Sequence, residues 1–178
     1  MILDGTWRTV ESIDSISSLV CLSKVTKLIR FERVPTLIFQ TFLSYLTNLK
    51  SLTLTTFVLD SLNAAVFQYM QYLYSLNIVQ LDDNYRHYVN IEPFCTMFPK
   101  IEHLDIPIDN LDSCQYIIDR LKQSLISVIF RFPIDENEDD EDDEDDNDKY
   151  HELIQWSHNV LHNHQYRIHD GDIYLWLQ

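Results

Sequence analysis

Glycine is nearly absent from this chain: among its 178 residues there are two, Gly5 and Gly171. The phosphate-binding loop of P-loop NTPases and the dinucleotide-binding fingerprint each need at least two glycines close together, because the backbone must approach the phosphates. Here the two glycines lie near opposite ends of the chain. The sequence therefore excludes a glycine-rich nucleotide-binding loop, and we expect no cofactor.

Cysteines are also few, and long apolar runs are missing. Three cysteines, Cys21, Cys95 and Cys114, make an odd number without paired spacing, which favours reduced, buried thiols over a disulfide framework. No apolar run approaches the roughly 20 residues that cross a bilayer. Residues 1–4 lack the basic and apolar regions of a secretory signal. We expect a cytoplasmic or nuclear protein without a membrane partner.

Positive charge is scarce, with 13 Lys and Arg against 28 Asp and Glu and a net charge of −15. Residues 135–148 hold 12 of the acidic residues, which leaves 16 against 13 in the remainder of the chain. That remainder is close to neutral, so the sequence offers no basic surface for nucleic acid. The length fits one domain, 1–178, with enough residues for a core.

One pattern is abundant: apolar residues at the first, fourth and sixth positions of a six-residue stretch. It occurs at 49–54, 73–78, 101–106 and 125–130, and residues 25–30 match it except at the last position. The middle apolar residues follow one another at intervals of 24, 24, 28 and 24 residues: Leu28, Leu52, Leu76, Leu104 and Val128. Intervals in the twenties are typical of leucine-rich repeats.

The spacing within each unit indicates a strand with one apolar side. The second and third apolar positions are two residues apart, so a strand points both to the same side. One such unit cannot bury that side alone, but stacked units can. We predict an α/β leucine-rich repeat solenoid, a curved parallel sheet on the concave face with helices on the convex face. Five to seven parallel strands should follow sequence order, with the five middle residues buried in one row.

The segments between these strands have helical spacing of apolar residues. It predicts helices over 11–22, 35–46, 62–73, 91–98, 112–121 and 150–162, with a turn at Gly171 before a closing strand at 173–177. Residues 135–148 have no apolar side chain and repel one another, so we predict a disordered acidic insertion within a C-terminal capping repeat. Trp156, Ile173 and Leu175 should nevertheless pack against the preceding repeat.

Two stretches resemble the repeats of F-box/LRR substrate adaptors. They are L-T-N-L-K-S-L-T-L at 46–54 and F-P-K-I-E-H-L at 98–104, and the resemblance covers roughly residues 20–132. An F-box-like segment is not visible before the repeats. The resemblance implies a leucine-rich repeat module that recognises a protein partner, including substrate recognition for an F-box-type ubiquitin ligase.

In this register the residues beside each core pair point to the concave face. Solenoids commonly bind partners there. We therefore predict a partner-binding surface made of Lys27, Ile29, Phe31, Ser51, Thr53, Thr55, Ser75, Asn77, Val79, His103, Asp105, Ser127, Ile129 and Arg131.

The acidic stretch 135–148 offers an alternative function. It could attract basic proteins such as histones, or it could be a solvated linker. A leucine-rich repeat joined to an acidic stretch resembles the acidic leucine-rich nuclear phosphoproteins. Deleting residues 135–148 would separate the two functions, because recognition by the concave face should survive the deletion and charge-driven binding should not.

Histidines are concentrated near the C-terminus. His158 and His162 have the i,i+4 spacing of metal ligands on a helix, with His151, His164 and His169 nearby. The alternative is the polar outer face of a helix, and we expect no metal site. No nucleophile–base pair or pair of catalytic carboxylates has a defensible spacing, so we expect that the protein is not an enzyme.

Overall fold

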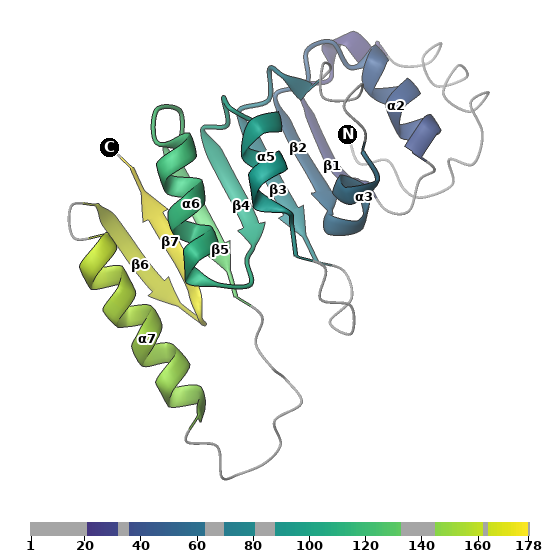
Figure 1. Ribbon diagram of the computed structural model, residues 1–178. Coiled ribbons are helices and arrows are strands. Elements are labelled where there is room, and N and C mark those ends of the chain that lie inside the picture. The colour runs from purple at the N-terminus through teal and green to yellow at the C-terminus, as the bar shows by residue number, and fades with distance from the viewer. Residues whose placement is uncertain are drawn as a thin grey trace.

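The computed structural model describes residues 21–31, 36–62, 70–80, 88–132, 145–161 and 164–177, and in these it is an open α/β structure (Figure 1). The described residues form one sheet of seven strands, in the order β1-β2-β3-β4-β5-β7-β6. The α/β class predicted from the sequence is therefore confirmed. The strands are β1 (Lys27–Phe31), β2 (Ser51–Thr55), β3 (Ser75–Val79), β4 (His103–Pro107), β5 (Ser127–Arg131), β6 (Gln165–His169) and β7 (Asp172–Trp176).

Strands β1 to β5 are parallel and lie in sequence order, as the repeat spacing predicts. Their middle apolar residues pair directly with one another, each to the equivalent residue of the next strand. All five are buried, none with more than 3% of its surface exposed: Leu28, Leu52, Leu76, Leu104 and Val128. The predicted buried row is thus confirmed, and it continues through Leu175 of β7.

Successive units are joined by the same main-chain contact. The carbonyl oxygen of Thr26, just before β1, accepts hydrogen bonds from the amides of Lys50 and Ser51 at 2.8 and 3.0 Å. The carbonyls of Lys50, Tyr74 and Glu102 each accept the equivalent pair from the following unit. The same pair of hydrogen bonds is present across the 28-residue interval between Leu76 and Leu104, so the four extra residues of that unit lie outside this main-chain contact.

A side-chain contact repeats as well. Asn48 Nδ2 donates to the carbonyl of Ser23 at 2.7 Å, and Ser124 Oγ donates to the carbonyl of Pro99 at 3.0 Å. Asn48 and Ser124 both stand four residues before the middle apolar residue of their units. Each therefore satisfies a carbonyl of the preceding unit at the same place in the repeat.

The last two strands depart from the prediction. β7 pairs antiparallel with β5, and β6 pairs antiparallel with β7. The closing strand predicted at 173–177 nearly matches β7, but the run of parallel strands ends at β5, the lower limit of the five to seven predicted. The antiparallel pairing of β6 with β7 follows from the turn at Asp170 and Gly171, whose φ angles of 49° and 76° are those of a two-residue hairpin turn. So short a turn can connect only antiparallel strands.

The described helices are η1 (Leu22–Lys24, a 3₁₀ helix), α2 (Thr36–Tyr45), α3 (Thr56–Ser61), α5 (Ile91–Met97), α6 (Leu111–Leu121) and α7 (Asp145–Val160). The predictions for α2, α5 and α6 are confirmed to within a few residues. α3 was not predicted. The predicted helices at 11–22 and 62–73 lie mostly outside the described residues. No described helix is long and apolar enough to cross a membrane.

Helix α7 begins five residues earlier than predicted, at Asp145. The prediction of disorder is therefore wrong for residues 145–148, which form the first turn of α7. Carboxylates are favourable in a first turn because the amino end of a helix carries partial positive charge. Residues 135–144 lie outside the described part of the chain. Trp156 is partly buried against the core and Ile173 and Leu175 are buried, as predicted.

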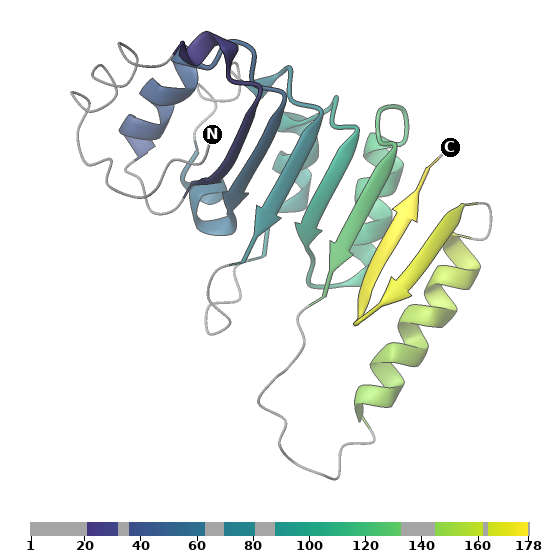
Figure 2. The same cartoon turned by 180° about the vertical axis from the view of Figure 1, so that it is seen from behind.

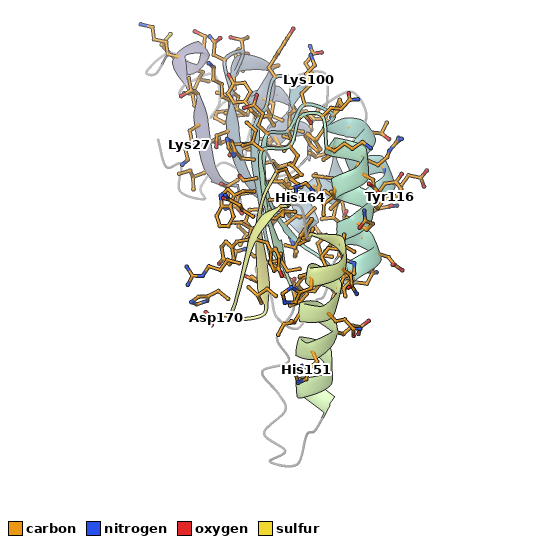
Figure 3. All side chains as sticks on the ribbon, turned by 90° about the vertical axis from the view of Figure 1, so that its left-hand side faces the viewer. Lys27, Lys100, Tyr116, His151, His164 and Asp170 are labelled. Carbon is orange, nitrogen blue, oxygen red and sulfur yellow. The ribbon has the colours of Figure 1, made fainter. Side chains whose placement is uncertain are left out.

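The sheet separates two different faces. Helices α5, α6 and α7 lie on one face, and Figure 2 views the other face, in front of which no described helix stands. Figure 3 looks along the sheet from the β6 end: Tyr116 of α6 lies on the helix side and Lys27 of β1 on the opposite side. The side without described helices is called the open face below.

The three thiols have different surroundings, contrary to the expectation that all are buried. Cys95 and Cys114 are buried, whereas Cys21 is exposed, and all three are free. Burial raises the pKa of Cys95 to about 11 and raises the pKa of Cys114 further, with a contribution from nearby Asp109. Thiolates are the reactive species.

We therefore expect only Cys21 to react rapidly with a disulfide reagent such as dithionitrobenzoate near pH 8. Cys95 and Cys114 should react only after denaturation, because both are buried and their pKa values are raised. The measurement is the amplitude of the fast phase, and Cys21→Ser should remove it. A fast phase that persists in Cys21→Ser would contradict the expectation.

Candidate functional site on the open face

Strand pairing aligns the outward residues of the sheet into rows. The first row contains Lys27, Ser51, Ser75, His103, Ser127, Trp176 and Gln165. The second contains Thr53, Asn77, Asp105, Ile129, Tyr174 and Arg167. At the carboxyl end of the parallel strands, a third row contains Arg131, Asp172 and His169, joined by the Arg131–Asp172 ion pair and the Asp172–His169 strand pair, with partly exposed Val79 at the corresponding end of β3. These residues define the open face.

Most residues of the predicted binding surface lie on this face. They are Lys27, Ile29, Ser51, Thr53, Ser75, Asn77, Val79, His103, Asp105, Ser127, Ile129 and Arg131, all exposed or partly exposed. The prediction is wrong for Thr55, which is buried and whose hydroxyl accepts a hydrogen bond from the amide of Val58 as the N-cap of α3. Phe31 lies opposite Leu54, beyond a break in the β1–β2 register, rather than in the second row.

Arg131 connects three strands across the open face. Its Nε and Nη2 donate to the two carboxylate oxygens of Asp105 on β4, at 2.6 and 2.8 Å. Its Nη1 donates to Asp172 Oδ2 on β7 at 2.9 Å. The side chain of Arg131 is 45% exposed, while those of Asp105 and Asp172 are each 14% exposed. The guanidinium thus binds two largely buried carboxylates and links the β6–β7 hairpin to the parallel strands β4 and β5.

The electrostatics of this cluster follow from its burial. Burial raises the pKa of Asp172, and the nearby Arg131 charge opposes that rise. The pKa of Arg131 is raised, chiefly by its hydrogen bond to Asp105. Arg131 therefore stays charged, and its planar fork leaves further N–H donors for a ligand.

An aromatic and aliphatic patch lies next to this cluster. Ile129 is directly opposite Tyr174, and Trp176 is two residues beyond Tyr174 on the same strand. Trp176 is 42% exposed, and Ile129 and Tyr174 are partly exposed. Tyr, Trp and Arg are the residue types that most often dominate binding energy at protein interfaces. The patch therefore has the composition of an interface centre.

His103 is the polar neighbour of this patch. Its Nδ1 is 2.8 Å from Ser127 Oγ, and Ser127 is the cross-strand neighbour of Trp176. A hydrogen-bonded His–Ser pair and the Arg131 cluster therefore flank the apolar patch. That arrangement, apolar in the centre and polar around it, is typical of interfaces between proteins.

A cavity of about 310 Å³ opens at the carboxyl ends of β3, β4 and β5. Its lining is mainly apolar, with Arg131 at one side; the lining residues are Asn77, Ile78, Val79, Gln80, Pro107, Arg131 and Phe132. The cavity is therefore continuous with the third row of the open face. Its size suits an inserted side chain of a partner.

The C-terminal histidines do not converge. His158 Nδ1 is 3.0 Å from Tyr166 Oη, His169 Nδ1 is 2.6 Å from Asp170 Oδ2, and His162 lies outside the described residues. Within the described ranges, no group of three or more potential ligand residues could hold a metal ion.

Sequence reasoning missed the part of the site on the C-terminal hairpin. Asp172, Tyr174, Trp176 and the outward residues of β6 were not among the predicted surface residues, because β6 was not predicted and the closing strand was interpreted only for its buried residues Ile173 and Leu175. The Asp-Gly pair between two alternating stretches is the signal that predicts this hairpin.

Comparisons with known proteins return no relative for this chain. No family model, no curated protein and no solved structure matches it.

Proposed function

We propose that this chain is a leucine-rich repeat type recognition module that binds a protein partner on its open face. The observation that carries the proposal is the patch of Ile129, Tyr174 and Trp176 beside the Arg131 cluster, on a face with no described helix over it. This patch supplies most of the binding energy, while the small polar residues of β2 and β3 provide a surface of complementary shape. The cavity beside Arg131 accepts an apolar side chain of the partner.

Photo-cross-linking tests this proposal. Tyr174→p-benzoylphenylalanine places the photoreactive group on the open face, and Tyr116→p-benzoylphenylalanine places it on the exposed side of α6. We expect a defined adduct in cell extract from position 174 and not from position 116. The adduct should be competed by unlabelled chain and weakened about tenfold or more by Trp176→Ala, the scale of an interface hot spot.

A partner cross-linked equally at both positions, or one insensitive to Trp176→Ala, would contradict binding by the open face. The identity of the purified partner then tests a narrower proposal, that the chain presents substrates to an F-box-type ubiquitin ligase. That proposal rests on the sequence resemblance of 46–54 and 98–104 alone. It requires a ligase subunit in the same complex.

The second candidate is binding of basic proteins through the acidic stretch, which the sequence supports with 12 acidic residues in positions 135–148. Because α7 begins at Asp145, the deletion that tests it should remove only residues 135–144. Binding by the open face should survive this deletion. Loss of the Tyr174 adduct on deletion, together with a steep dependence on salt, would favour the acidic stretch instead.

A further inference from the structure

Strand β6 is an edge strand, and its outer side has no partner strand among the described residues. Of the described strands only β7 pairs with it, and α7 lies on the helix side of the sheet (Figures 1 and 3). Tyr166 of β6 contacts His158 of α7 on that side. Edge strands present a row of unpaired backbone groups to which another strand can be added. The other edge, β1, has a register break between Leu28 and Phe31, which disfavours such pairing.

The features that usually block an edge are few in β6. Its five residues pair with β7 without a break, and it contains neither proline nor lysine. The two residues that flank a two-residue turn, here His169 and Asp172, form a hydrogen-bonded pair. Hydrogen-bonded and non-hydrogen-bonded pairs alternate along an antiparallel ladder, so Tyr166 and Ile168 belong to non-hydrogen-bonded pairs. The backbone N–H and C=O groups of Tyr166 and Ile168 therefore point away from β7, toward the outer edge.

We propose that this edge accepts an extended segment of a partner protein as an eighth strand, with an acidic residue of that segment facing Arg167. Arg167 is exposed on the open-face side of β6 and forms no ion pair with the described residues. Tyr166 and Ile168, on the other side of β6, are partly buried against the core. The added strand thus meets a positive charge on one face and apolar side chains on the other.

Charge argues against a second copy of the chain as the added strand. If β6 of one copy paired with β6 of another through the outward backbone groups, Tyr166 of each copy would lie opposite Ile168 of the other. That register places the two Arg167 side chains directly opposite each other. Like charges in that position destabilise a strand pair. Each copy also carries a net charge of −15, which opposes self-association. The favoured occupant is therefore a different protein.

The probe is a linear peptide selected on the whole chain from a random display library and then synthesised. We expect selected peptides to alternate apolar residues with Asp or Glu. In the free chain the amide hydrogens of Tyr166 and Ile168 should exchange rapidly, and the bound peptide should protect them. The Arg167 amide, which faces β7, should be protected in both states. This exchange pattern is specific to strand addition, because a peptide on the open face leaves the edge amides exposed.

Two pairs of variants complete the test. Ile168→Pro removes an outward N–H and should reduce peptide affinity at least about tenfold relative to Ile168→Ala, which shortens the same side chain but keeps the N–H. Arg167→Glu should weaken binding more than Lys27→Glu, which makes the same charge change at the β1 edge. The Arg167 pair also tests the proposal should Ile168→Pro fail to fold.

The proposal is overturned by any of three results: no protection of the Tyr166 and Ile168 amides, equal affinity in the two variants of either pair, or self-association of the chain that protects these amides without peptide. It does not depend on partner binding by the open face. Trp176→Ala removes a side chain from that face and leaves the β6 backbone unchanged, so the two proposals can fail separately.

Discussion

Replacing Leu52 with alanine is expected to lower the free energy of unfolding by about 3 kcal/mol. Leu52 is 0% exposed and lies in the middle of the buried row, between Leu28 and Leu76. The substitution removes three carbon atoms from a row that is packed on both sides and so leaves a cavity. Neighbouring units cannot move to fill it, because the main-chain hydrogen bonds between successive units fix their positions. Urea denaturation monitored by circular dichroism measures the change.

Leu37→Ala is the matched control, because it makes the same substitution at a leucine that is 67% exposed on α2. We expect a change within about 0.5 kcal/mol for this variant. Of the apolar residues in this helix, Leu37 faces solvent, whereas Ile38, Phe42 and Leu43 are buried as their helical spacing predicts. Similar losses from Leu52→Ala and Leu37→Ala would contradict the buried row as the main source of stability.

The second large effect is expected at Arg131, and it should depend on pH. Arg131→Ala leaves the carboxylates of Asp105 and Asp172 close together, mostly covered and without a counter-charge. At neutral pH we expect a loss of about 2 kcal/mol, the scale for charged hydrogen bonds reduced for the partial exposure of Arg131. The loss should be measured by denaturant unfolding across a pH series.

The sign of the pH dependence follows from Asp172. Its pKa in the folded protein is raised above the ordinary 3.8, so protonation favours the folded state. Its contribution is fully present below pH 3.8 and is lost as pH rises through the raised pKa. Without Arg131 the pKa rises further, so the variant should lose most stability at neutral pH and least in acid.

Two other variants separate the charge of Arg131 from its shape. Arg131→Lys keeps the charge but cannot bridge Asp105 and Asp172 with a planar fork, so an intermediate loss is expected. Arg120→Ala removes the same charge from α6, where Arg120 lies 6.0 Å from the ring centroid of Tyr116, and little change is expected. A loss in Arg131→Ala that is independent of pH would contradict the coupling to Asp172.

The repeat spacing predicted the part of the fold that local and periodic forces determine. Because equivalent residues recur at near-constant intervals, Leu28, Leu52, Leu76, Leu104 and Val128 pair in one row and five parallel strands follow sequence order. Twelve predicted surface residues consequently lie on the open face, since alternation along a strand determines which side chains point outward. Their role in binding a partner stays a prediction.

Errors arose where the chain leaves the repeat. Thr55 has the right alternation for the open face, but the chain turns into α3 at that residue and its hydroxyl becomes a helix cap. Residues 145–148, three of them acidic, satisfy every compositional criterion for disorder, yet they form the first turn of α7, a position where negative charge is favourable. In both cases the end of a helix determines the local structure, rather than the side-chain alternation or the composition of the segment.

The sequence by itself determined the α/β class, the parallel order of β1 to β5 and the row of buried residues, because periodic burial of apolar side chains leaves few alternatives. Only the tertiary structure decided how the sheet ends. An antiparallel hairpin at 165–176 puts Trp176, Tyr174 and Asp172 beside Ser127, Ile129 and Arg131. The hairpin itself has a local signal in its Asp-Gly turn, but the direction of β7 beside β5 depends on which pairing buries Ile173 and Leu175. That contact joins segments about 45 residues apart, and no local pattern encodes it.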